Sequence, residues 1–277
     1  MPTSPEIMYH GFLTGPSLWS ARGRVLGWPH DRFEAVRLSE QCALAASGFE
    51  PLVSSQLPGY GARAGQIAVT CLQMATCPVL VRDRTSHDLI GFIALRTTQI
   101  EGVKSGYILL TVFDPEVQAG GVFASALAWL ATALELDVVA ATTNVPGLVS
   151  GMWKVSDRIA ASPWCYPHDA LAPGPARAAT AWARRCVGAA IDKPPAEIEL
   201  DEQLVRRGLR EHNLQLRATD DYLGELDQPG VSERMARIIE RMRSMNMRDG
   251  DAVVAIAALS PRGSRLVARG FRENPRA

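Results

Sequence analysis

Near the middle of the sequence, an apolar strand leads through a glycine-containing loop directly into a helix. The segment reads VFDPEVQAGGVFASALAWL over residues 112–130, with Gly120 and Gly121 adjacent at the bend. Backbone N–H groups at the start of a helix, together with the helix dipole, favour an anion. Taken alone, the loop fits two interpretations: a site for a compact anion, or a strand-to-helix turn in which the glycines serve the geometry only.

Strand signals before this loop predict a three-stranded antiparallel meander over residues 78–113. Its β-branched, apolar runs are separated by turn-forming residues and cover 78–83, 89–100 and 107–113. After the loop, apolar patterns predict a helix, a buried strand and a second helix over 124–136, 137–143 and 144–161.

The first part of the chain carries weaker patterns. Residues 1–20 show no periodicity and are expected to form an irregular lead-in. The spacing of apolar residues that begins at Phe33 predicts a helix over 31–46. A short strand is expected over 49–57, followed by a helix over 66–75.

The second half of the chain begins with a Pro/Ala-rich stretch that predicts a linker over 162–179. Helices are expected beyond it, and the chain closes with a hairpin signal; these segments are 180–191, 202–216, 230–247 and 251–271. We therefore expect an α/β core over 20–165 and a mostly helical extension over 166–277. The terminal β-hairpin either stands apart from the core sheet or completes it.

The composition excludes several classes of protein. The 277 residues are 47% hydrophobic, and 29 basic side chains balance 29 acidic ones, so no nucleic-acid or membrane-surface partner is predicted. No apolar run reaches the roughly 20 residues that span a bilayer, and the N-terminus lacks an export signal. The five cysteines form no CxxC pair. We expect a cytoplasmic, globular protein with reduced thiols and no metal.

Other catalytic and phosphate-binding motifs do not fit the sequence. The loop lacks the Lys-Ser/Thr of a P-loop and the GxGxxG spacing of a dinucleotide fingerprint. The segment GLVSG at 147–151 is not GxSxG, so Ser150 is not a nucleophile elbow.

The order meander, glycine loop, helix, strand, helix resembles that of the GNAT acetyltransferase superfamily over roughly 78–160. In that family a strand ending V-x-P runs into a loop written (Arg/Gln)-x-x-Gly-x-(Gly/Ala). Here Pro115 follows the strand, and Gln118 and Gly121 stand at the first two specified loop positions. Phe123 departs from the pattern, because the family has a small residue there.

The resemblance implies an α/β (α+β) fold, a GNAT-like mixed sheet with flanking helices. It implies an N-acetyltransferase that moves an acyl group from acetyl-CoA, or another acyl-CoA, to a primary amine of a small molecule. A weaker resemblance of 27–38 to sugar-nucleotide amine acetyltransferases suggests an amino sugar nucleotide. The implied CoA-binding residues lie on the strand, the loop and the segment after the next strand: Val112, Phe113, Gln118, Ala119, Gly120, Gly121, Val122, Phe123 and Asn144. For Asn144, the alternative is a cap on the following helix.

The catalytic residues are less clearly marked. Tyr107 is the only titratable side chain on the strand before the loop, and we take it as the candidate base. Trp153 stands where the family often has a tyrosine acid, so a tyrosine acid is excluded at that position. Together with Phe123, this departure leaves an alternative open: a non-catalytic interaction or regulatory protein on a degenerate GNAT scaffold. A homodimer is also left open.

Overall fold

The computed structural model describes residues 32–38, 44–56, 63–100, 102–118, 121–160, 164–166, 184–189, 193–201, 204–205, 236, 239–240, 242–243, 245 and 251–263. The chain divides into two compact units. Unit 1 comprises Met1–Thr97 and Ile108–Trp129, and unit 2 comprises Thr98–Tyr107 and Leu130–Ala277. Two strands and one helix therefore contribute residues to both units.

Unit 1 contains the predicted meander and one strand more. Its strands are β1 (Phe33–Arg37), β2 (Cys77–Asp83), β3 (Leu89–Ile100) and β4 (Val103–Phe113), and they lie side by side in that order. Strand β2 pairs antiparallel with both β1 and β3. The prediction of the meander is confirmed, with one difference: β4 begins four residues before position 107, because the turn after β3 is short and Gly102 closes it at φ 76°.

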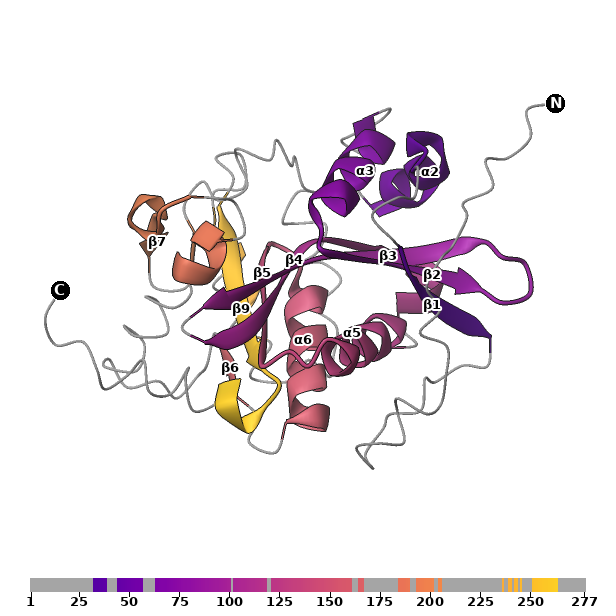
Figure 1. Ribbon diagram of the computed structural model, residues 1–277. Coiled ribbons are helices and arrows are strands. Elements are labelled where there is room, and N and C mark those ends of the chain that lie inside the picture. The colour runs from indigo at the N-terminus through magenta and orange to yellow at the C-terminus, as the bar shows by residue number, and fades with distance from the viewer. Residues whose placement is uncertain are drawn as a thin grey trace, which may run out of the picture. The chain divides into compact units, whose positions relative to one another are not determined.

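Helices flank the unit 1 strands. Helices α2 (Ala46–Gln56) and α3 (Ala64–Met74) pack against each other. Figure 1 shows them on one face of β2 and β3, with α5 (Val122–Ala133) on the other face. A short helix, α4 (Pro115–Gln118), precedes α5. The predictions for α3 and α5 are confirmed, and α5 is apolar nearly all round because it is buried nearly all round.

Two predictions for the N-terminal region are wrong. The segment around Phe33 is strand β1 rather than a helix, because it pairs with the outer edge of β2, with Phe33 opposite Asp83. The segment expected as a strand is α2, whose buried residues Phe49, Leu52 and Val53 have helical spacing. In both places, contacts with other elements of the fold outweigh a weak local sequence pattern.

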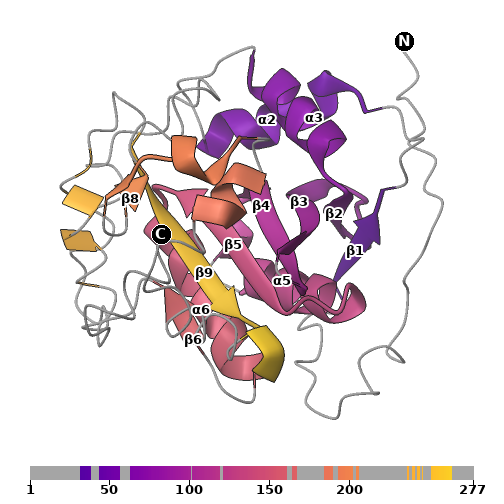
Figure 2. The same cartoon turned by 60° about the vertical axis from the view of Figure 1, so that its left-hand side comes forward.

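Unit 2 is built around β9 (Ala252–Ala258), and all seven of its residues are buried. Strand β9 pairs antiparallel with β5 (Val138–Thr143) and, along its other edge, with β6 (Trp164–Tyr166) and β8 (Leu204–Val205). Strand β7 (Leu200–Asp201) follows β8, so the order in this unit is β4-β5-β9-β8-β7. Figure 2 shows β9 running beside β5.

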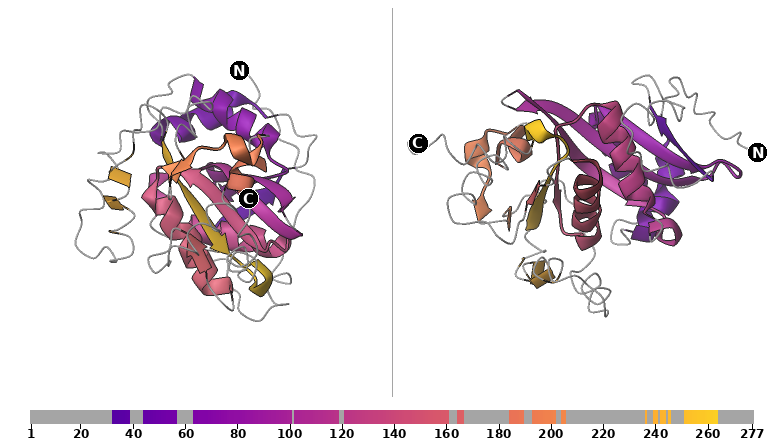
Figure 3. Two further views of the ribbon diagram at one scale, coloured as in Figure 1. Left: turned by 90° about the vertical axis from the view of Figure 1, so that its left-hand side faces the viewer. Right: turned by 90° about the horizontal axis from the view of Figure 1, so that it is seen from below.

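Helix α6 (Pro146–Ile159) covers the β5–β9 sheet, as Figure 3 shows. The Ser156 hydroxyl of α6 donates a hydrogen bond to the carbonyl of Ala258, 2.6 Å away, and both residues are buried. The predictions of β5 and α6 are confirmed. Within the described ranges, no helix has the length and apolarity that a membrane span requires.

The C-terminal predictions have mixed outcomes. Leu204 and Val205 form a strand rather than the start of a helix, because they pair with β9; the remainder of 206–216 lies outside the described residues. In the expected helix over 230–247, the described residues at 236, 239–240 and 242–243 are helical, and Ile239 and Met242 are buried, whereas the described residue at 245 is not helical. The first arm of the expected terminal hairpin is β9, and residues 264–271 of its second arm lie outside the described residues.

Candidate functional site

The loop after β4 begins with an aspartate turn. The backbone N–H of Asp114 donates to the carbonyl of Ile90, 2.8 Å away, which ties the end of β4 to the start of β3. The Asp114 carboxylate accepts a hydrogen bond from the N–H of Glu116, and the backbone carbonyl of Asp114 accepts one from the N–H of Val117. Asp114 is therefore a turn residue that begins α4 and directs the chain toward α5.

Gly121 sets the start of α5. Its φ of 71° lies in the left-handed region, and its carbonyl accepts the N–H of Ser125 at 3.0 Å. A Cβ at position 121 would meet nothing within 4 Å, so the backbone conformation, not lack of space, selects glycine here. The first four N–H groups of an α-helix have no acceptor within the helix. Ala119, Gly120 and the side chain of Gln118 lie outside the described residues.

The apolar residues around the loop are core residues. Val112, Phe113 and Val122 are at most 4% exposed. The half-buried ring of Phe123, the residue that departs from the family pattern, packs edge-on against Phe113 with 5.9 Å between centroids. A ligand at this loop would meet the backbone of these residues, because their side chains are engaged in packing.

Tyr107 lies in unit 2 and is 6% exposed. Its hydroxyl donates a hydrogen bond to the hydroxyl of Thr142 on β5, 2.5 Å away. Burial raises the pKa of Tyr107 to about 12, and the bonds from Thr142 oppose this only in part. At neutral pH the phenol is protonated, so it can donate a hydrogen bond but does not serve as a base in this state.

Asn144 also lies in unit 2 and is 2% exposed. The residue after Asn144, Val145, is the N-cap of α6. The N–H of Val145 donates a hydrogen bond to the hydroxyl of Thr143, 2.9 Å away. Trp153, in the middle of α6, is 5% exposed. The structure thus brings Tyr107 to Thr142 in unit 2, and Phe113 to Phe123 in unit 1.

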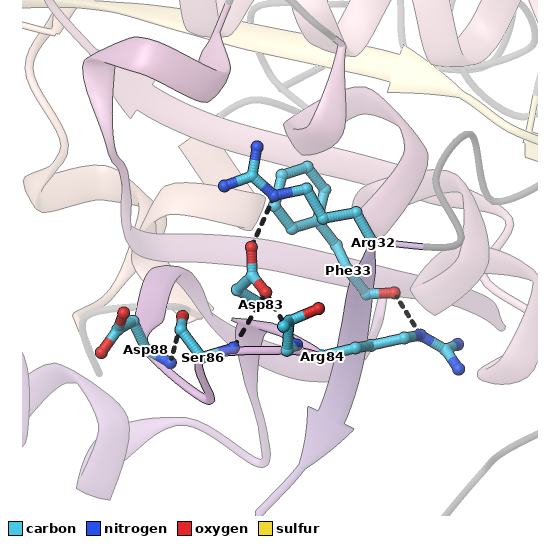
Figure 4. A network of polar contacts seen from close by, with 7 residues as sticks. Arg32, Phe33, Asp83, Arg84, Ser86 and Asp88 are labelled. Carbon is cyan, nitrogen blue, oxygen red and sulfur yellow. Dashed lines mark hydrogen bonds and ion pairs between the residues drawn. The ribbon is translucent and has the colours of Figure 1, made fainter.

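A separate polar network stabilises the β2–β3 turn (Figure 4). One carboxylate oxygen of Asp83 accepts a hydrogen bond from Arg32 at 2.5 Å, and the other accepts the N–H groups of Thr85 and Ser86. These bonds hold the pKa of Asp83 below its usual value, and the bond from Arg32 has the largest effect. The Arg32 guanidinium also stacks over the ring of Phe33, 5.1 Å from its centroid. The network is a structural one, because both oxygens of Asp83 are engaged within the protein.

Sequence reasoning missed the partners of the site residues. Phe113 packs against Gly91 on β3, and Tyr107 bonds Thr142 on β5. Both of these strands are neighbours of β4. Only the pairing of strands brings them to their partners, and no local sequence signal marks either residue. In the described ranges, His, Cys, Asp and Glu form no group of three or more that could hold a metal ion.

No protein-family model and no curated protein matches the sequence. Among solved structures, the chain is similar to a GNAT family N-acetyltransferase from Escherichia coli in complex with CoA. The sequence identity is 13%, the matched region covers 43% of this chain and 66% of that chain, and the TM-score is 0.34. It is similar to an aminoglycoside 6'-acetyltransferase type Ii: 12% identity, 40% and 72% of the two chains, TM-score 0.33. It is also similar to a Saccharomyces cerevisiae N-myristoyltransferase with bound myristoyl-CoA. Here the identity is 13%, the matched region covers 41% of this chain and 30% of that chain, and the TM-score is 0.32.

These likenesses concern the fold alone. The chain spans less than two thirds of the length of the Escherichia coli protein. The mixed α/β fold class expected from the sequence is confirmed by the order of this chain's own elements, β2-β3-β4, α5, β5, α6.

Proposed function

We propose that this protein binds an acyl-CoA and transfers the acyl group to a primary amine of a small molecule. The observation that carries the proposal is Gly121: a left-handed glycine at the start of a buried 12-residue helix, directly after a strand–turn connection. A CoA pyrophosphate is a compact dianion that suits backbone N–H groups at a helix N-terminus. The order of elements around this glycine supports the same interpretation.

The residues divide into three groups in this proposal. The loop of Gln118, Ala119, Gly120, Gly121, Val122 and Phe123 binds the pyrophosphate through its backbone. Val112 and Phe113 offer backbone groups to the pantetheine, since their side chains are buried. Asn144 supplies a side-chain amide to a pantetheine amide.

The reaction is a direct transfer between two bound substrates. The amine nitrogen attacks the thioester carbonyl, a C–N bond forms, the C–S bond breaks, and the amine proton leaves as the CoA thiol is released. Alignment of the substrates supplies most of the acceleration in such a reaction. Tyr107, first considered as a base, enters the proposal as a neutral phenol, because its raised pKa favours the protonated form.

A thermal shift with CoA tests the binding step. Specific binding stabilises the folded state by about 3 kcal/mol at a hundredfold excess over Kd, and the melting temperature then rises with ligand concentration. Free pantetheine, which lacks the pyrophosphate, is the matched control and is expected to give a much smaller shift. Melting curves that do not move with CoA would contradict the proposal.

A second function, CoA binding without transfer, is favoured by two observations. Trp153 occupies the position where a tyrosine acid is expected, and an indole N–H is no acid near neutral pH. Tyr107, the candidate base, is buried, and its raised pKa disfavours the deprotonated form that a base requires. Release of CoA thiol from acetyl-CoA in the presence of an amine panel, with amino sugar nucleotides included, separates the two: an enzyme releases thiol with at least one amine, and a binding module with none.

A further inference from the structure

The first turns of α5 contain a single polar side chain, that of Ser125. Residues 122–131 are otherwise apolar, and Ser125 itself is 3% exposed. A serine inside a helix commonly donates its hydroxyl to the carbonyl four residues earlier. Here that carbonyl, on Gly121, accepts the backbone N–H of Ser125 at 3.0 Å. In the described part of the chain, no hydrogen bond of the Ser125 hydroxyl accompanies this backbone bond.

The hydroxyl of Ser125 is buried but not sealed off. Ser105 on β4 gives the comparison, because it is 2% exposed and its hydroxyl oxygen is fully enclosed and unpaired among the described residues. The hydroxyl oxygen of Ser125 is not one of these enclosed atoms, so it keeps contact with the surface. Buried hydroxyls in native structures are nearly always paired with a protein, water or ligand atom. Ser125 therefore offers a donor whose partner comes from outside the described residues.

Helix geometry places this hydroxyl beside Gly121. Residues four apart lie on the same face of an α-helix, and a helical side chain leans over the turn that precedes it. Gly121 has no side chain, and a Cβ at this position would meet no atom within 4 Å. The space over Gly121 is therefore open in the direction in which Ser125 leans. Both residues belong to unit 1.

We infer that the hydroxyl of Ser125 donates a hydrogen bond to an oxygen of the CoA pyrophosphate. The inference rests on the proposed acyl-CoA function and adds a side-chain donor to a site otherwise formed by backbone. A pyrophosphate accepts hydrogen bonds through several oxygens, and the N–H groups of residues 122–124 have no acceptor within the helix. Residues 119–130 contain no basic side chain, so neutral donors have to bind the dianion here.

Three ligands that share the pyrophosphate test the inference without knowledge of the amine. Calorimetric titration of the full chain measures the Kd values of CoA, acetyl-CoA and dephospho-CoA, which lacks the ribose 3'-phosphate. We expect Ser125→Ala to weaken the binding of all three by the same factor, about tenfold or more, as for one hydrogen bond to a charged group. Ser105→Ala is the matched control, because it removes an equally buried serine hydroxyl of unit 2, and it should bind all three as the wild type does.

The melting temperature of the ligand-free protein separates a ligand contact from a structural one. Removing a hydroxyl that has no partner within the protein should not destabilise the fold, and alanine favours a helix more than serine does. Ligand-free Ser125→Ala is therefore expected to melt at the wild-type temperature or slightly above it. A lower melting temperature would overturn the inference, because the hydroxyl would then have a structural partner.

The pattern across the three ligands decides which group the hydroxyl serves. Weakening of acetyl-CoA alone would assign it to the acyl group, and an effect that disappears with dephospho-CoA would assign it to the ribose phosphate; either result overturns the inference. Unchanged affinity of folded Ser125→Ala for all three ligands would overturn it as well, while CoA binding by the wild type stands. Failure of the folded wild type to bind any of the three would instead overturn the proposed function, and the inference with it.

Discussion

The ring of Phe113 lies directly against the backbone of Gly91. A Cβ at position 91 would lie 2.3 Å from the ring, well inside van der Waals contact. The same ring packs edge-on against Phe123 at the start of α5. In unit 1, the glycine on β3 therefore allows the last residue of β4 to join the strand to the helix that follows the loop. The backbone of the candidate site is held by this apolar contact.

Replacing Gly91 with alanine is expected to lower the free energy of unfolding by roughly 1–3 kcal/mol, the usual effect of adding a methyl group to a packed core. Chemical denaturation measures the change. Gly48→Ala in α2 is the matched control, because a Cβ there meets nothing within 4 Å and alanine favours a helix. Equal stability of Gly91→Ala and wild type would show that Phe113 does not pack as described.

Removing the ring of Phe123 separates packing from ligand binding. Phe123→Ala loses the contact with Phe113, worth roughly 0.5–1.5 kcal/mol beyond its buried area. We expect a lower free energy of unfolding but a CoA affinity within about twofold of wild type, because the backbone and not the ring binds the phosphates. A large loss of affinity in folded Phe123→Ala would assign the ring a direct role.

The buried phenol of Tyr107 predicts a loss of stability at alkaline pH. Its pKa is raised from 10.0 to about 12 in the folded protein, so between these values the unfolded chain releases the proton while the folded chain keeps it. The free energy of unfolding therefore falls as pH rises from 10 toward 12, by roughly 3 kcal/mol in total. Urea denaturation at pH 8.5 to 11.5 should show this fall in the wild type and a smaller one in Tyr107→Phe. Parallel curves would contradict the burial of Tyr107.

Asp83 predicts the opposite dependence at acid pH. A carboxyl group whose pKa is lowered in the fold contributes stability above its unfolded pKa and loses it as pH falls through the folded value. At pH 7 the wild type should therefore melt at a higher temperature than Asp83→Asn, and the difference should shrink as the pH falls below about 4. A difference that stays constant from pH 7 to pH 3 would show that the Arg32 bond does not matter.

Much of the fold could be predicted because its signals are local. Strands β2, β3 and β5 and helix α5 have strong apolar patterns bounded by turn residues, and the sequence places all of them. It also places α6, although Pro146, Gly147 and Gly151 interrupt the pattern of that helix. Strands β1 and β8 have weak patterns and exist because β2 and β9 offer unpaired edges. No local pattern carries that information.

The candidate site could be predicted for the same reason only in part. Gly121 is visible in the sequence because a glycine after a strand and before a helix is a local signal. Thr142 is not, because it becomes relevant only when β5 brings it to Tyr107. The change in the role of Tyr107 likewise depends on burial that a single strand does not reveal.

Calorimetric titration of CoA into the wild type, Gly121→Val and Gly48→Ala tests whether the loop before α5 binds CoA. Valine strongly disfavours the φ of 71° at position 121, so it should displace the N–H groups at the start of α5. Circular dichroism confirms that each variant is folded. We expect Gly121→Val to weaken CoA binding at least tenfold, while Gly48→Ala binds CoA as the wild type does. Equal affinity of all three proteins for CoA, or no binding by the folded wild type, would contradict a CoA site at this loop.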